Sequence, residues 1–132
     1  MISKLIAASA PAEILLFDQS EYQLYLIDQE LGEQFPNLAR HAVIGDVRDA
    51  DHLHQTFARF RPEVVFHAAA IKHVPLSELN PDQAVLTNIL GSKQVADACI
   101  AHHVSAMVQV STDKAVNPLS VMGATKRAAE IY

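Results

Sequence analysis

The chain has 132 residues, of which 50% are hydrophobic and 19% are charged, so it is long enough to bury a core and too apolar to be disordered. Its formal net charge of −5 argues against a surface for nucleic acid or for an anionic membrane, because neither attracts an acidic protein. No stretch reaches the apolar length of a membrane span, and the single cysteine, Cys99, cannot form an internal disulfide, so we expect a cytoplasmic protein in a reducing compartment.

Short apolar runs alternate with amphipathic stretches along the chain. The short runs indicate strands, whereas apolar residues spaced three and four apart indicate one face of a helix. In chain order, the expected elements are a short helix over 1–10, a strand over 14–17, a helix that begins at Ser20, a strand over 42–44, a helix that Pro62 closes, a strand over 64–66, a long helix after Pro81, a strand over 107–110 and a last helix from about Val121.

Continuous apolar strands that alternate with helices predict a parallel sheet covered on both faces, in a doubly wound, Rossmann-like α/β layout. No internal repeat or linker is visible, so we expect one partial NAD(P)-binding domain over 1–132. The Gly-rich turn that normally cradles a pyrophosphate at a helix N-terminus is missing. The only glycines are Gly32, Gly45, Gly91 and Gly123. The pattern therefore predicts an incomplete fold that begins one element late.

Reactive side chains follow the last expected strand. Thr112, Asp113 and Lys114 place a hydroxyl, a carboxylate and an amine at its carboxyl end, where open α/β sheets bind ligands. Met122 and Lys126, one helical turn apart, share a helix face and have the Tyr-x-x-x-Lys spacing of short-chain dehydrogenases, with methionine in place of tyrosine. Methionine cannot transfer a proton, so that task must move to another group such as Asp113.

Several motifs together resemble those of the CapD-like polysaccharide-biosynthesis proteins, which are nucleotide-sugar 4,6-dehydratases of the extended short-chain dehydrogenase superfamily. The matching segments are 17–21 (FDQSE), 45–49 (GDVRD), 67–75 (HAAAIKHVP), 87–91 (TNILG), 111–118 (STDKAVNP) and 122–127 (MGATKR). The resemblance implies a phosphate loop upstream of Met1 and a smaller substrate domain downstream. It also implies N-terminal membrane helices in the larger relatives, and this sequence contains none. We therefore expect a fragment of such an enzyme.

The resemblance implies a site for NAD or NADP, with NAD favoured because Asp18 suits a free ribose 2′-hydroxyl. Asp18 has a second interpretation as a turn or N-cap aspartate ahead of Ser20, and Asp46 as a helix-start aspartate. The small residues after the third strand suit either a flat dinucleotide or tight packing. The expected cofactor-binding residues are Asp18, Asp46, Val47, His67, Ala68, Ala69 and Lys126.

The implied reaction oxidises a sugar at C4, removes water across C5 and C6, and returns the hydride to C6. It needs a base for the C5 proton, an acid for the C6 hydroxyl and a group at the C4 oxygen. Dehydratases that retain C5 configuration carry Asp-Glu here, so Asp-Lys resembles the inverting subgroup. Lys114 is then the base, Asp113 the acid and Thr112 the partner of the C4 oxygen, with Met122 and Lys126 completing the expected catalytic set. The alternative for Asp113 and Lys114 is an exposed turn pair of little energetic value.

Three further residues are candidates for the sugar-nucleotide site: Lys72, His73 and Asn88. Asn88 has an alternative role in packing with a polar contact. We expect no metal site, because His52/His54 and His102/His103 are helical pairs at spacings that do not share a face, and solvated surface is the simpler interpretation.

Two main functions stay open: an enzyme or its catalytic fragment acting on a UDP-N-acetylhexosamine, and a non-catalytic remnant or interaction module. A nucleotide-sugar epimerase or reductase is a third and is disfavoured by Met122. The absent first strand normally lies between the first and third strands of this sequence, so a gap with unpaired edges is expected. We hypothesise that the chain is weakly stable, or rescued by forming a homo-oligomer or by association with the missing parts. A cooperative, concentration-independent melt of a monomer would count against this.

Overall fold

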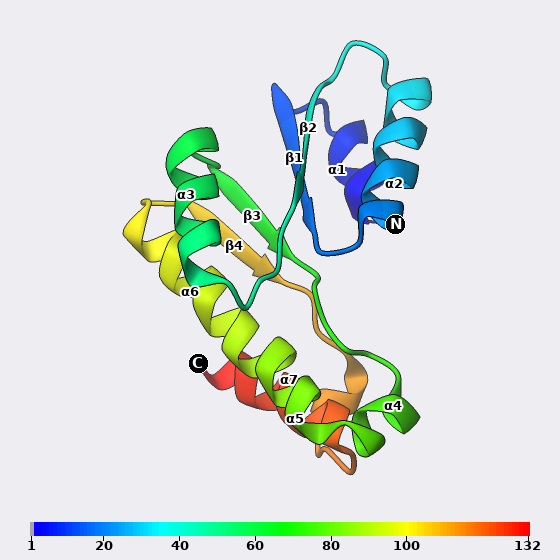
Figure 1. Ribbon diagram of the computed structural model, residues 1–132, viewed down its shortest axis with the longest axis vertical. Coiled ribbons are helices and arrows are strands. Elements are labelled where there is room, and N and C mark those ends of the chain that lie inside the picture. Colours follow the sequence, from blue (N-terminus) through cyan, green and yellow to red (C-terminus); the bar gives the residue numbers. More distant parts are fainter. Residues whose placement is uncertain (1) are drawn as a thin grey trace. The chain divides into compact units, whose positions relative to one another are not determined.

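The computed structural model describes residues 2–132 and contains the expected alternation of strands and helices (Figure 1). In chain order, its elements are α1 (Ile2–Ala8), β1 (Glu13–Asp18), α2 (Glu21–Gln34), β2 (Ala39–Ile44), α3 (Ala50–Phe60), β3 (Val64–His67), α4 (Val74–Leu79), α5 (Pro81–Ala84), the π-helix η1 (Val85–Gly91), α6 (Ser92–Ala101), β4 (Ala106–Gln109), the 3₁₀ helix η2 (Asp113–Ala115) and α7 (Val121–Ile131). Each expected strand and helix is confirmed to within a few residues. The short helices α4 and η2 were not predicted, because neither is long enough to show an apolar period.

The chain divides into two compact units, one up to Asp46 and one over 47–132. In the first unit, β1 and β2 pair in parallel from Glu13–Ala39 to Asp18–Ile44. Helix α2 starts where the sequence predicts, and the Ser20 hydroxyl accepts a hydrogen bond from the Gln23 N–H as an N-cap. Its apolar face completes a small core that contains Ala7, Ile14, Ile27 and Leu31.

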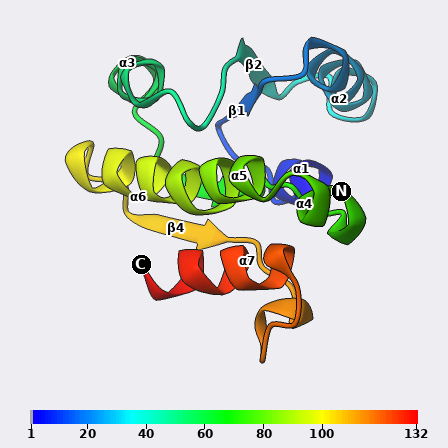
Figure 2. The same cartoon turned by 60° about the horizontal axis from the view of Figure 1, so that its bottom comes forward.

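In the second unit, β3 and β4 pair in parallel from Val64–Ala106 to His67–Gln109. Helices α5, η1 and α6 follow one another without a break from Pro81 to Ala101 and form one rod in Figure 2. The rod contacts α3 through α6 and α7 through η1. The long helix expected after Pro81 is therefore present, but its middle is a π-helix, a local feature that often marks functional positions.

The strands form two separate pairs rather than one sheet: among residues 2–132, β1 is bonded only to β2, and β3 only to β4. The incomplete, parallel α/β fold expected from the sequence is thus present as two strand pairs. Val64, Phe66 and Val108, which lie on one face of the β3–β4 pair, are 48%, 40% and 44% exposed.

No helix within residues 2–132 is long and apolar enough to span a membrane.

Candidate functional site

The loop after β4 is shaped by hydrogen bonds of Thr112. Its hydroxyl oxygen accepts from the Lys114 N–H at 3.3 Å, which starts the 3₁₀ helix η2, and its hydroxyl donates to a carboxylate oxygen of Asp113 at 3.0 Å. Because β3 and β4 are parallel neighbours, this loop lies at the same end of the pair as the segment that follows His67. The expected grouping at the carboxyl ends of the strands is therefore present.

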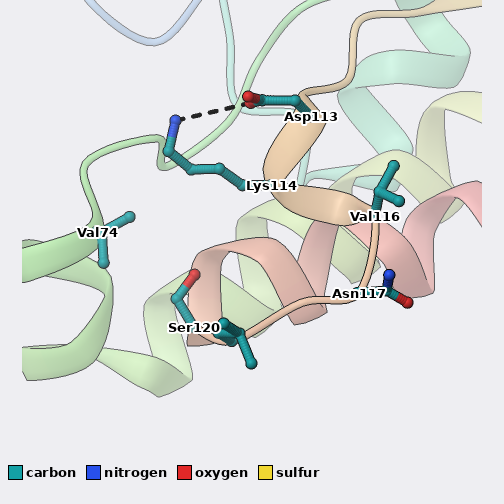
Figure 3. A pocket seen from close by; sticks show the side chains of 7 residues that line it. Val74, Asp113, Lys114, Val116, Asn117 and Ser120 are labelled. Atoms are coloured by element: carbon teal, nitrogen blue, oxygen red, sulfur yellow. Dashed lines mark ion pairs between the residues drawn. The ribbon is translucent and has the colours of Figure 1, made fainter.

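Asp113 and Lys114 form an ion pair in the lining of an open pocket (Figure 3). Lys114 Nζ lies 3.8 Å from Asp113 Oδ1, and the two side chains are 58% and 92% exposed, respectively. The Thr112 hydroxyl, and then the Lys114 ammonium, lower the pKa of Asp113 below its usual value, so this carboxyl is an anion in the open site. The pocket has a volume of about 400 Å³ and is lined by Val74, Asp113, Lys114, Val116, Asn117, Leu119 and Ser120.

Helix α7 packs against η2, and its residues Met122 and Lys126 lie outside the pocket lining. Met122 and Lys126 are 3% and 6% exposed. Lys126 Nζ donates to the backbone carbonyl of Val110 at 3.0 Å, and burial lowers its pKa, with Glu130 opposing that shift. The structure thus separates the exposed pair Asp113–Lys114 from the buried Met122 and Lys126.

Asn88 lies at the centre of the π-helix and is fully buried. Its carboxamide oxygen accepts from the Ile71 N–H at 2.8 Å, and its amide group donates to the Ile71 carbonyl at 3.0 Å and to the Thr125 hydroxyl at 2.9 Å. Both amide hydrogens are therefore used within the protein. Asn88 holds the segment after β3 against helix α7, which agrees with its alternative role in polar packing.

Lys72 and His73 are exposed, immediately before α4. Helix α4 is attached to α7, because a carboxylate oxygen of Glu78 accepts from the Val121 N–H at 2.8 Å. Ser120 completes this end of α7 by accepting from the Gly123 N–H at 3.1 Å. Sequence reasoning missed Asn117, Ser120 and Glu78. The N-cap serine before a helical pattern is a signal that can identify Ser120, but Glu78 has no signal in the sequence.

The expected cofactor-binding residues belong to both units. In the first unit, Asp18 is exposed and its carboxylate accepts from the Ser20 N–H at 2.8 Å, so its turn role is realised, while Asp46 is half-buried. In the second, Val47 and His67 are buried, Ala68 is exposed and Ala69 half-buried. A β-carbon on Gly91 would lie 2.7 Å from a methyl group of Val47, so glycine allows close packing there.

His54 and His102 differ from the expected solvated surface. Both are half-buried, and His54 Nδ1 lies 3.1 Å from His102 Nε2, in hydrogen-bond contact between α3 and the end of α6. The sequence could not show this, because the two residues are brought together by the packing of α3 against α6. Within residues 2–132, no three His, Cys, Asp or Glu side chains are grouped so that they can hold a metal ion.

The fold consists of parallel β–α units, and helix α7, which carries Lys126, packs against the loop of Thr112, Asp113 and Lys114. This arrangement is of the short-chain dehydrogenase/reductase type of Rossmann fold. The second unit alone shows this loop and helix. Among solved structures, Pen from Bacillus thuringiensis is similar with a TM-score of 0.88 and 36% identity, over 98% of this chain and 39% of that one. A dTDP-glucose 4,6-dehydratase from Streptomyces venezuelae, solved with NAD bound, shares the fold at 22% identity and a TM-score of 0.81, over 98% of this chain and 45% of that one.

The chain belongs to the polysaccharide biosynthesis protein family, whose sequence profile matches residues 1–132. It is 45% identical to the probable polysaccharide biosynthesis protein EpsC of Bacillus subtilis, over 98% of this chain and 22% of that protein. It is 38% identical to an inverting UDP-N-acetylglucosamine 4,6-dehydratase of Campylobacter jejuni, over 91% of this chain and 34% of that enzyme. UDP-glucose 4-epimerases also match. The chain thus spans between a fifth and about a third of the length of these curated relatives.

Proposed function

We propose that this chain is the catalytic part of a nucleotide-sugar 4,6-dehydratase that acts on a UDP-N-acetylhexosamine, inverts C5 and serves the biosynthesis of a surface polysaccharide. The observation that carries this proposal is the Asp113–Lys114 pair, a carboxylate and an ammonium 3.8 Å apart in the lining of an open pocket. The similarity to an inverting dehydratase over 91% of the chain supports it. The activity would belong to a longer protein, since the relatives extend well beyond the matched segment.

The proposed roles of Asp113 and Lys114 depend on how the exclusion of water changes their protonation. In the open site, Asp113 is ionised, whereas an acid for the C6 hydroxyl must be protonated and a base for the C5 proton must be unprotonated. Burial beneath a substrate disfavours charged forms, so it raises the pKa of a carboxyl group and lowers that of an amine. The proposed roles therefore require a site that becomes closed to water beneath the substrate, with the proton of the pair on Asp113. Thr112 would hydrogen-bond the C4 oxygen.

The nicotinamide cofactor, when bound, supplies the acceptor for the C4 hydride and returns that hydride to C6. The second unit has groups that fit its ribose end, because Lys126 Nζ uses one of its three hydrogens on Val110 and keeps two for a ribose hydroxyl. Ala68 and Ala69 have no bulk that would keep a flat ring from the backbone. Asp18, Asp46 and Val47 remain predictions from the sequence, and NAD remains favoured over NADP on the same ground.

The test is turnover of UDP-N-acetylglucosamine with NAD⁺ in heavy water, followed by proton NMR. We expect a 4-keto, 6-deoxy product with deuterium at an inverted C5. Lys114→Met removes the base at similar side-chain length and should slow turnover by at least about 100-fold. Lys93→Met, a substitution in a half-buried i,i+4 pair with Asp97 outside the pocket lining, is the matched control and should leave the rate unchanged. Equal rates for the Lys114 variant and the wild type would refute the assignment.

The second candidate is a non-catalytic remnant or interaction module. It is favoured by one observation, the separation of the strands into two pairs with β1 and β3 unpaired on one side within the described residues. A folded chain that binds neither NAD⁺ nor NADP⁺ in calorimetry would support this candidate. Micromolar binding that is lost in Lys126→Ala would support the enzyme.

A further inference from the structure

A buried polar contact joins the end of β3 to the start of α6. His67 is 4% exposed, and its Nε2 lies 2.9 Å from the hydroxyl oxygen of Ser92, which is 3% exposed. The same hydroxyl lies 2.7 Å from the Asn88 carbonyl and donates its hydrogen there, and it accepts from the Gln109 side-chain amide at 3.3 Å. A hydroxyl has only one hydrogen. The His67 Nε2 must therefore carry a hydrogen and donate it to Ser92.

The surroundings of His67 favour a neutral ring. Burial, and then the positive charge of Lys126, lower the pKa of His67 from 6.5 to about 4. A neutral imidazole with its hydrogen on Nε2 has no hydrogen on Nδ1. One tautomer of the neutral side chain thus satisfies the contact with Ser92 without placing a second positive charge beside Lys126.

The contact continues as a chain of hydrogen bonds toward α7. Ser92 is bonded to the Asn88 carbonyl, and the Asn88 side chain is bonded to the Thr125 hydroxyl, which donates to the Met122 carbonyl at 2.9 Å. These bonds connect β3, the π-helix and the turn of α7 that contains Met122 and Lys126. The side chains that form this series of hydrogen bonds are all buried, so water does not compete for these bonds.

We infer that His67 is a positioning residue for the dinucleotide site: as a neutral Nε2–H donor to Ser92, it holds the π-helical turn at Asn88 and, through Asn88, the Lys126 turn of α7. This inference rests on the proposed function, in which Lys126 contacts the nicotinamide ribose. It explains why an ionisable residue stands at a buried strand end. A side chain there must donate one hydrogen bond and stay uncharged next to an ammonium group.

The first test is nitrogen NMR of the imidazole groups in the ligand-free chain, with the His67 signals assigned by their loss in His67→Gln. We expect a neutral ring with its hydrogen on Nε2 that does not titrate between about pH 5.5 and 8, where an ordinary histidine does. A hydrogen on Nδ1 in the neutral ring, or a titration midpoint near that of a free histidine, would overturn the inference. This readout does not depend on any activity.

The second test is NAD⁺ affinity by calorimetry, with the melting temperature of each variant measured so that all are compared in the folded state. His67→Leu and Ser92→Ala remove the buried bond and should weaken binding by about tenfold. His67→Gln keeps an uncharged N–H donor and should rescue most of the affinity. His103→Asn, at an exposed histidine of the same unit, is the control for loss of a histidine.

The outcomes separate the two levels of the proposal. NAD⁺ affinity that is unchanged in His67→Leu, or weakened equally in His67→Gln and His67→Leu, would overturn the positioning role alone. A wild-type chain that shows the Nε2–H tautomer but binds no NAD⁺ would overturn the dinucleotide site and the positioning role with it.

Discussion

The carbonyl oxygen of Lys114 lies 2.3 Å from the point where a β-carbon on Gly123 would stand. The 3₁₀ helix η2, which carries Asp113 and Lys114, is therefore packed on the first turn of α7 more closely than any other residue at position 123 allows. Gly123 is thus required for close approach rather than for an unusual backbone angle, since no glycine of residues 2–132 has a positive φ.

Gly123→Ala should displace η2, because the atom in the way is backbone and cannot rotate aside. We expect a loss of about 1–3 kcal/mol in the free energy of unfolding, measured with urea, as for overpacked sites. Ala124→Ser, at the exposed neighbouring position, is the control and should change stability by less than about 0.5 kcal/mol. Equal stability of Gly123→Ala and the wild type would show that the close contact is not maintained in solution.

The bond between Glu78 and the Val121 N–H predicts a difference between two substitutions. Glu78→Ala leaves the first turn of α7 without this acceptor and should cost about 0.5–2 kcal/mol, the usual cost of losing an N-terminal cap. Glu78→Gln keeps an oxygen acceptor without the charge and should recover most of that loss. Thermal unfolding of the three proteins checks this. If the two variants are equally destabilised, charge rather than the hydrogen bond holds α4 to α7.

The lowered pKa of His67 predicts a pH dependence of stability. The unfolded chain takes up a proton near pH 6.5, whereas the folded chain does so near pH 4, because of burial and then Lys126. The free energy of unfolding therefore keeps its full value above pH 6.5 and falls as the pH is lowered toward 4. The loss that His67 causes reaches about 3 kcal/mol. Urea unfolding over this range should give a flatter pH profile for His67→Gln than for the wild type. Parallel profiles would contradict the shift.

Cys99 should be a slow nucleophile in the folded chain. It is 6% exposed, and burial raises the pKa of its thiol, so little of the reactive thiolate forms at neutral pH. A thiol-specific colour reagent should react with the native chain much more slowly than with the chain in denaturant, which is the matched control. Rapid stoichiometric reaction under native conditions would mean that α6 opens readily.

The unpaired strands predict association. β3 is bonded only to β4 among residues 2–132, and Val64, Phe66 and Val108 are exposed on one face of the pair. Free strand edges and exposed apolar side chains favour pairing with another chain. The midpoint of thermal unfolding should therefore rise with protein concentration, in parallel with the molecular mass from light scattering. A monomer with a concentration-independent melt would exclude this.

Local patterns in the sequence were sufficient for most elements. Short apolar runs identified the four strands of residues 2–132, and the apolar period identified α2, because these features depend on residues close together in the chain. The parallel pairing of neighbouring strands was also predictable, since strands that alternate with helices pair in parallel. The partners of the Asn88 side chain were not, because Ile71 and Thr125 are far away from it in sequence.

The sequence by itself determined the family, the incomplete α/β fold and the adjacency of Thr112, Asp113 and Lys114, since all three depend on the order of residues along the chain. Only the tertiary structure decided which of the predicted site residues line the pocket and which are buried outside its lining. Burial and hydrogen bonding are set by neighbours distant in sequence. Lys126, for example, donates to the Val110 carbonyl, and His67 contacts the Ser92 hydroxyl. Burial in the packed fold also lowers the pKa of His67 and of Lys126, because desolvation acts only after the elements have packed.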